Sequence, residues 1–201
     1  IERTVFTPDH EAFRDSFRRF IDKEIVPFHE AWEEQGYVAR EVWNKAGENG
    51  FLCTSMPEAY GGADADKLYS VIQMEELARA GTSGIGYSLH SEIVAPYILH
   101  YGTEAQKRKW LPGLASGEIL PTAGFTEPNT GSDLGSLRTR ATRDGDDWTI
   151  TGNKTWITHA ARTHVMTLLA RTDPTTTDYK GLSMFLAEKT PGTDDAPGPA
   201  I

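Results

Sequence analysis

The stretch G-F-T-E-P-N-T-G-S at Gly124–Ser132 is the part of the sequence around which the rest is arranged. Pro128 fixes the backbone φ angle and Gly131 permits conformations closed to other residues, so we expect a turn whose backbone passes close to a ligand. A second stretch, T-W-I-T at Thr155–Thr158, places the ring of Trp156 beside a hydroxyl in a strand-like context. Together they predict an aromatic wall and polar contacts for a planar heteroaromatic cofactor.

Upstream of this stretch the apolar residues recur at helical spacing, as in Phe13, Phe17 and Phe20. Thr7 is the expected cap of the first helix, and Pro27 ends or bends it. A third helix is expected at 66–80, with its buried side formed by Leu68, Val71, Ile72, Leu77 and Ala78. The other expected helices lie at 41–48, at 83–100, and after the capping box of Thr103 and Gln106.

After Gly117 the pattern changes to period two, which indicates strands. The expected strands lie at 137–143, 148–151, 165–170 and 182–187, with a turn at Asp144-Gly145. A run of helices followed by a run of strands predicts an α+β protein. We therefore expect an N-terminal all-helical bundle domain at 1–119, followed by a small antiparallel β-barrel or sandwich domain at 120–201. Thr190–Ile201 is expected to be a loose tail.

Composition excludes several classes of function. The chain has 201 residues and a net charge of −9, which argues against nucleic-acid binding. Arg138, Arg140 and Arg143 are expected on a solvated strand face. One cysteine, Cys53, indicates a reducing compartment and a core position, and no apolar run reaches membrane-spanning length. We therefore expect a cytoplasmic protein without a membrane span.

Other site motifs are absent or misplaced. Gly81, Gly84 and Gly86 are spaced G-x-x-G-x-G without a preceding strand, so they predict a turn between helices and not a dinucleotide fingerprint. There is no Walker loop and no serine-hydrolase elbow. The six histidines do not form the helical pair of a metal site, so no metal is expected.

Two separated motifs resemble the acyl-CoA dehydrogenase family: T-E-P-x-x-G-S-D at Thr126–Asp133 and D-G-D-x-W-x-I-x-G-x-K-x-W-I-T at Asp144–Thr158. The run Y-G-x-x-x-Q-K-x-x-W-L-P at Tyr101–Pro112 extends the resemblance toward the N-terminus. Members of that family continue into a C-terminal helical domain that is not in this sequence. The resemblance therefore implies two domains of a larger flavoprotein, with FAD as the cofactor and acyl-CoA as the substrate.

The resemblance also implies site residues. Cofactor contacts are expected from Phe125, Thr126, Gly131, Ser132, Trp156, Ile157 and Thr158, and substrate contacts from Ser132, Tyr87 and Leu89. In the family the hydroxyl matching Thr158 lies close to flavin N5, the atom that takes the hydride. Asn129-Thr130 and His159 depart from the usual family residues. Glu127 is expected to fix the turn and not to act as a base, because a carboxylate beside the pyrimidine ring disfavours the reduced anion.

The reaction that the resemblance implies is α,β-dehydrogenation of an acyl-CoA thioester to trans-2-enoyl-CoA, with electrons passed to an electron-transfer flavoprotein. The family's catalytic glutamate belongs to the missing domain, so no catalytic residue is assigned and the isolated chain is expected to be inactive. The full-length protein is expected to be a homo-oligomer of fatty acid metabolism. A flavin-dependent acyl-CoA oxidase or monooxygenase and a non-catalytic binding module remain alternatives. Acyl chain length is not legible from the sequence.

Overall fold

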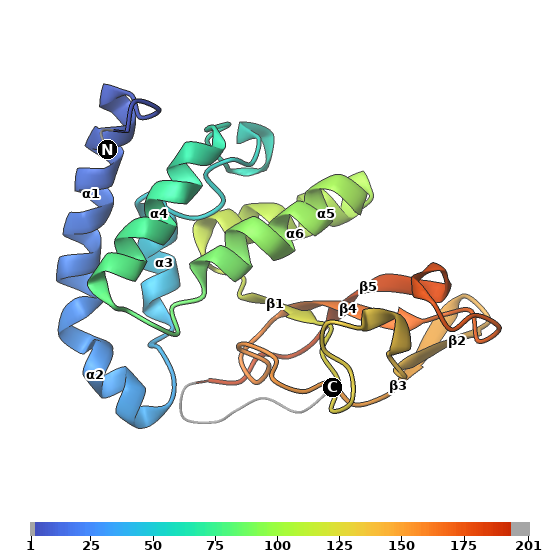
Figure 1. The fold of residues 1–201 in the computed structure, drawn as a ribbon. Helices are drawn as coiled ribbons and strands as arrows, with labels where there is room; N and C mark the ends of the chain where they lie inside the picture. The colour runs from blue at the N-terminus through green and yellow to red at the C-terminus, as the bar shows by residue number, and fades with distance from the viewer. Residues whose placement is uncertain (1–2, 194–201) are drawn as a thin grey trace. The chain divides into compact units, whose positions relative to one another are not determined.

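The computed structural model describes residues 3–193 and divides into two compact units that meet in sequence between Leu120 and Pro121. The first unit is helical and the second is built on a sheet, which confirms the predicted α+β class (Figure 1). Most of the loose tail predicted at Thr190–Ile201 lies outside the described residues.

The helical unit begins where its capping residues predict. The hydroxyl of Thr7 accepts a hydrogen bond from the backbone N–H of His10, and Nδ1 of His10 accepts one from the backbone N–H of Thr7. Thr103 and Gln106 form the predicted capping box. The elements are α1 (Pro8–Glu24), α2 (Val26–Gln35), α3 (Glu41–Glu48), η1 (Glu58–Tyr60), α4 (Lys67–Ala80), the π-helix η2 (Leu89–Val94), α5 (Ala95–Tyr101) and α6 (Glu104–Ser116).

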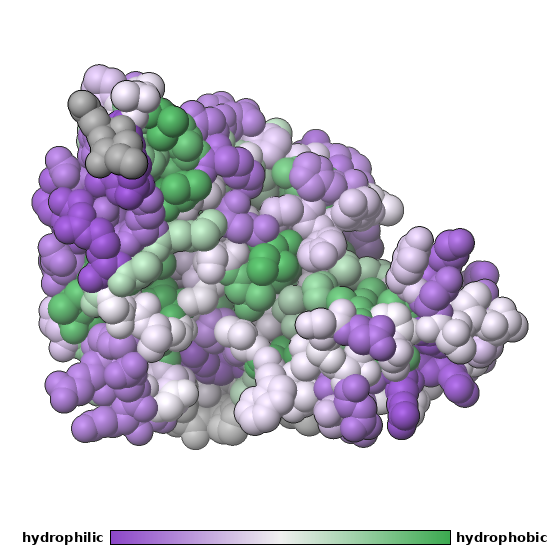
Figure 2. Space-filling view, viewed as in Figure 1, coloured by the Kyte–Doolittle hydropathy of each residue, from purple (hydrophilic) through white to green (hydrophobic). Residues whose placement is uncertain are grey.

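The core of this unit is aromatic. The rings of Phe17 and Phe51 meet edge to face with centroids 4.9 Å apart, and Trp43 of α3 is completely buried. Such pairs add about 1 kcal/mol to the burial of the rings themselves. α1 and α4 lie side by side over this core (Figure 1), while the outer surface of α1 is predominantly hydrophilic (Figure 2).

The buried side of α4 is not the apolar stripe that the sequence predicts. Val71 is 39 % exposed and Ala78 is also exposed, so the prediction for these two residues is wrong. The helix buries Glu76 instead, because Arg14 and Arg18 of α1 bind its carboxylate at 3.0 and 2.8 Å. A charged group becomes tolerable in the interior when it is paired and hydrogen-bonded, and this tertiary pairing overrides the helical periodicity.

The helix predicted at 83–100 starts later than expected, at Tyr87. Gly81, Gly84 and Gly86 precede it with φ of 68°, 76° and 72°, which is a backbone region that other residues rarely adopt. These glycines therefore form the predicted turn between helices. The π-helix η2 then widens the helix before α5 continues it.

The second unit holds a five-stranded sheet centred on β4. Its strands are β1 (Pro121–Gly124), β2 (Arg140–Asp144), β3 (Asp147–Thr151), β4 (Val165–Arg171) and β5 (Leu182–Glu188), with short 3₁₀ turns η3 (Leu134–Ser136) and η4 (Tyr179–Gly181). β2 and β3 form the antiparallel hairpin predicted from the turn signal at Asp144-Gly145. β4 and β5 are a second antiparallel pair.

β1 and β2 both pair with β4 in parallel, so the sheet is mixed and not purely antiparallel as predicted. β1 covers the first half of one edge of β4 and β2 joins the same edge at Arg171, while β5 occupies the other edge. Among the described residues the strands do not close into a barrel. Parallel pairing needs a long connection, and here that connection carries both motifs that the sequence singles out.

Candidate functional site

The turn at the first motif is closed by two backbone hydrogen bonds. The N–H of Glu127 donates to the carbonyl of Thr130 at 2.9 Å, and the N–H of Thr130 donates back at 3.0 Å. Pro128 and Asn129 form the exposed tip between them. The turn predicted from the Pro-Gly pair is therefore present, although the pair of bonds closes one residue before Gly131.

Glu127 fixes this turn to the neighbouring chain. Its carboxylate is 6 % exposed and accepts the backbone N–H groups of Arg138 at 2.6 Å and Thr139 at 2.9 Å, together with the ammonium of Lys154 at 3.0 Å. Burial alone would raise the pKa of Glu127, but these hydrogen bonds outweigh it and lower the pKa to about 2. A carboxylate held ionised in this way is a poor proton acceptor, in line with the expected turn-fixing role.

Lys154 ties the two motifs together. Its ammonium donates to the carbonyl of Phe125 at 3.0 Å as well as to Glu127, and the next residue, Thr155, donates its N–H to the carbonyl of Thr126 at 3.0 Å. Burial lowers the pKa of Lys154, and the Glu127 carboxylate opposes that shift. Lys154 lies within the second sequence motif, but no role was predicted for it; the signal that could have found it is a single cation just before the hydroxyl-rich segment Thr155–Thr158.

The segment Thr155–Thr158 is not a strand, and that expectation is wrong. Trp156 has φ of 58° and His159 has φ of 60°, so two non-glycine residues within four adopt the left-handed conformation. The carbonyl of Thr158 is held by the hydroxyl of Thr122 on β1. Strain of this kind costs about 1–2 kcal/mol per residue and concentrates at binding and catalytic sites.

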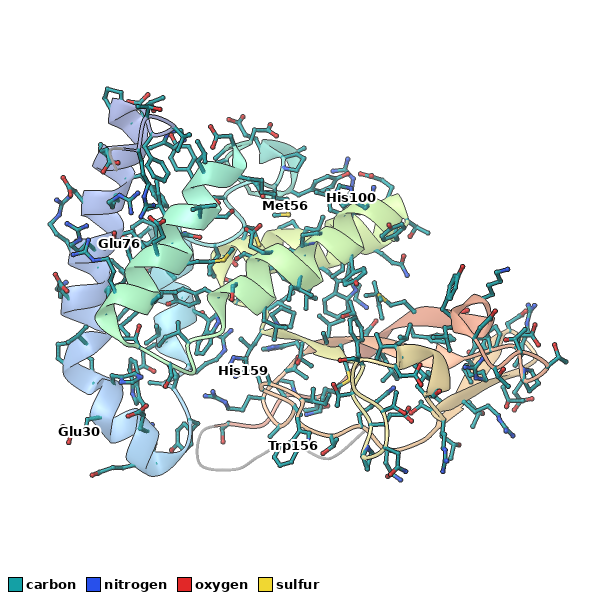
Figure 3. All side chains as sticks on the ribbon, in the orientation of Figure 1. Glu30, Met56, Glu76, His100, Trp156 and His159 are labelled. Carbon is teal, nitrogen blue, oxygen red and sulfur yellow. The ribbon has the colours of Figure 1, made fainter. Side chains whose placement is uncertain are left out.

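The left-handed turn exposes the side chain of Trp156 to solvent. The indole of Trp156 is 90 % exposed, and Figure 3 shows Trp156 and His159 on the same looped segment of this unit. An exposed tryptophan held by a strained backbone has no packing explanation within its own unit. The side chain is therefore available to cover a ligand.

Three hydroxyls at the motifs are also available. Within residues 3–193, those of Thr126, Ser132 and Thr158 form no hydrogen bond with another protein group. A Cβ added at Gly131 would meet nothing within 4 Å, so packing inside the unit does not require glycine there. Ile157 is half-buried beside them. The predicted cofactor residues thus lie on two hydrogen-bonded segments whose polar atoms and indole are not used by the fold.

These residues fit a flavin in their chemistry. An isoalloxazine ring presents a flat apolar surface and a rim of carbonyls and ring nitrogens, which suit an indole face and hydroxyl donors respectively. The carboxylate of Glu127 is occupied by three donors of its own. Asp133, at the end of the same motif, is exposed and accepts a hydrogen bond from the hydroxyl of Ser136.

The helical unit contains a separate cavity of about 370 Å³ beside α4. Tyr87 lines it, buried, with its hydroxyl donating to the carbonyl of Val42 at 2.9 Å. Leu89 is half-buried and does not line the cavity. The wall is mixed, since Met74, Leu77 and Ile85 line it together with the polar side chains of Gln73, Ser88 and Glu92.

Other kinds of site are not found in the described part of the chain. Residues 3–193 contain no cluster of three or more histidine, cysteine or acidic side chains able to hold a metal ion. Cys53 is a buried core residue, and burial raises the pKa of its thiol to about 12, so the thiolate that a nucleophile needs is disfavoured. None of the helices in this part of the chain has the length and apolar content needed to cross a bilayer.

The chain belongs to the acyl-CoA dehydrogenase family. Sequence models of the acyl-CoA dehydrogenase N-terminal domain and middle domain match residues 7–118 and 122–198. These two matches correspond to the helical unit and the sheet unit.

Curated proteins that are similar in sequence to this chain are also acyl-CoA dehydrogenases. The chain is 59 % identical over 191 residues to a (2S)-methylsuccinyl-CoA dehydrogenase of Cereibacter sphaeroides, covering 94 % of this chain and 35 % of the relative. It is 40 % identical to the rat mitochondrial long-chain specific acyl-CoA dehydrogenase, covering 92 % and 44 %. The chain thus spans less than half the length of these curated relatives.

Solved structures have the same fold. An acyl-CoA dehydrogenase from Geobacillus kaustophilus superposes with a TM-score of 0.89 at 41 % identity, covering 94 % of this chain and 50 % of that one. A glutaryl-CoA dehydrogenase from Mycobacterium smegmatis in complex with FADH2 superposes with a TM-score of 0.84 at 33 % identity, covering 93 % and 47 %.

Proposed function

We propose that this chain is the helical and sheet part of an FAD-dependent acyl-CoA dehydrogenase that converts an acyl-CoA thioester to its trans-2-enoyl-CoA. The observation that carries the proposal is the pairing of the two motifs by Lys154 and Thr155, which leaves the indole of Trp156 and three hydroxyls without a role in the fold. The family membership and the FADH2 complex of a relative support it.

The proposed roles follow from the chemistry of the residues. The backbone of Phe125 and Gly131 and the hydroxyl of Thr126 contact the flavin at its oxygen-rich end, and Trp156 and Ile157 cover the ring. Thr158 donates a hydrogen bond near the reacting nitrogen, and Ser132 lies between cofactor and acyl-CoA. FAD, when bound, supplies a hydride acceptor.

The remaining roles are divided between the helical unit and parts of the protein outside this chain. We assign the cavity at Tyr87 to the acyl group, with Leu89 supporting it. The base that removes the α-proton is proposed to belong to a further domain, so the isolated chain does not turn over. The full-length enzyme is proposed to be a cytoplasmic homo-oligomer that passes electrons to an electron-transfer flavoprotein.

Anaerobic reduction tests this function in the full-length protein. Purified holoenzyme is titrated with (2S)-methylsuccinyl-CoA, chosen because of the 59 % identical relative, and with palmitoyl-CoA as a long-chain comparison. Bleaching of the oxidised flavin band by one of them, with formation of the enoyl-CoA, is the expected result. A flavin that no acyl-CoA reduces would contradict the proposal.

The alternatives give different results in the same preparation. Fast oxygen consumption during turnover without an acceptor protein would favour an acyl-CoA oxidase or monooxygenase. A protein that purifies colourless and does not take up FAD would favour a non-catalytic binding module.

A further inference from the structure

The ion pair between Lys154 and Glu127 is buried. The two atoms are 3.0 Å apart, and the side chains are 9 % and 6 % exposed. Removing two charges from water costs several kcal/mol per ion, and a buried pair is often no more stabilising than apolar residues of the same volume. The burial of this pair is therefore better explained by a role in orienting the two motifs than by a contribution to stability alone.

Its contacts reach both motifs. The ammonium of Lys154 holds the carbonyl of Phe125, next to Thr126, while Lys154 itself is two residues from Trp156. The carboxylate of Glu127 anchors the same turn to the backbone of Arg138. Loss of either charge would therefore leave the backbone bond from Thr155 to Thr126 as the remaining described link between the two segments.

The pair also controls local charge. As a unit it is neutral, because the ammonium and the carboxylate are in direct contact. Removal of the lysine leaves an unpaired carboxylate, and removal of the glutamate leaves an unpaired ammonium. Charges in a partly desolvated site act more strongly than in water.

We propose that Lys154 and Glu127 are positioning residues that hold the two motifs at the spacing of bound flavin and neutralise each other's charge beside its ring. This inference rests on the proposed function, since it concerns the same FAD site. It goes further by assigning the affinity and the reduction potential of the flavin in part to a pair of residues that do not need to touch it.

The test uses two nearly isosteric variants of the full-length protein, Lys154→Met and Glu127→Gln, each measured for its FAD dissociation constant and flavin midpoint potential. We expect both to bind FAD at least about tenfold more weakly, because each variant loses a contact that holds the two motifs in the arrangement that binds the ring. The midpoint potentials should move in opposite directions. The midpoint potential of Lys154→Met should be more negative than that of the wild type, because the remaining carboxylate disfavours the reduced anion. The midpoint potential of Glu127→Gln should be more positive, because the remaining ammonium favours that anion.

Opposite shifts are not expected if the pair is only structural, because structural damage would change the potential in the same direction or not at all. Lys180→Met is the matched control, since Lys180 is an exposed lysine of the same unit and should leave both quantities unchanged. Lys154→Arg keeps the charge in case Lys154→Met does not fold. Its planar guanidinium cannot reproduce both ammonium contacts, so weaker FAD binding with a smaller change in potential is expected.

Unchanged affinity and potential in the Lys154 variants that fold would overturn the inference. Shifts of the same sign in Lys154→Met and Glu127→Gln would overturn its electrostatic part. Failure of the proposed function looks different, because the wild-type protein and Lys180→Met would then bind no FAD at all.

Discussion

At the scale of single residues, the left-handed conformation of Trp156 is the most informative feature. Its φ of 58° is unfavourable for any residue with a Cβ, and its 90 % exposed ring gains almost nothing from burial. Local energetics would favour glycine here. The presence of tryptophan is consistent with a position at which stability is exchanged for contact with a ligand.

This conformation predicts the order of two variants. Trp156→Gly should be more stable to urea than Trp156→Ala by about 1 kcal/mol, because glycine adopts positive φ without a Cβ clash. In an ordinary turn with negative φ, alanine would be equally stable or more stable. Urea unfolding of both variants without added FAD makes the comparison.

Glu127 predicts a pH dependence of stability. Its pKa is lowered from 4.5 to about 2 in the folded protein, so its contribution is fully present above about pH 4.5 and is lost as the pH falls toward 2. The full contribution is roughly 3 kcal/mol. Unfolding free energies of wild type and Glu127→Gln, measured across this range, should converge at the acidic end. A gap independent of pH would show that the carboxylate is not held ionised by folding.

At the scale of elements, two helix C-caps differ in how much room the surrounding residues leave for a side chain in place of glycine. Gly81 ends α4 and Gly117 ends α6, with φ of 68° and 78°. A Cβ at Gly81 would meet nothing within 4 Å, whereas a Cβ at Gly117 would lie 2.1 Å from the carbonyl oxygen of Trp43. The two caps share a conformation and differ in their surroundings.

Gly81→Ala should therefore cost about 1 kcal/mol, the usual penalty of positive φ. Gly117→Ala carries the same penalty and must also displace the backbone of α3, so we expect a loss of about 3 kcal/mol or more. Thermal or urea unfolding of the two variants separates the effects. Equal losses would mean that α3 and α6 can move apart without cost.

Local signals predicted some elements and failed at others for identifiable reasons. The N-cap of α1, the capping box of α6 and the extent of α3 were predicted, because they depend on neighbours in sequence. The buried face of α4 was not, because Glu76 finds its arginines on another helix. The parallel pairing of β1 with β4 was also missed, since strand order depends on a connection of 40 residues between Gly124 and Val165.

The candidate site shows the same division. The turn at Pro128 and the presence of an aromatic and a hydroxyl at Trp156 and Thr158 were legible in the sequence. The left-handed backbone at Trp156 and the bridging role of Lys154 were not, because both depend on tertiary contacts between segments about 28 residues apart. The assignment of these residues to FAD stays a prediction.

At the scale of the whole molecule, the two units divide the proposed work. The sheet unit carries the cofactor motifs, and the helical unit carries the cavity at Tyr87. The chain covers 35 % to 48 % of the length of the curated relatives that it matches. Binding of FAD is the part of the proposed function that depends most directly on the two motifs of this chain.

The most direct measurement is therefore the FAD dissociation constant of Trp156→Ala beside that of Trp148→Ala in the full-length protein. Trp148 is the matched control, because it is an exposed tryptophan of the same unit that packs on Phe185 of β5, with ring centroids 5.5 Å apart. If the two motifs enclose one flavin ring, Trp156→Ala should weaken binding about tenfold while Trp148→Ala leaves it unchanged. Equal FAD affinity in the two variants would contradict the account.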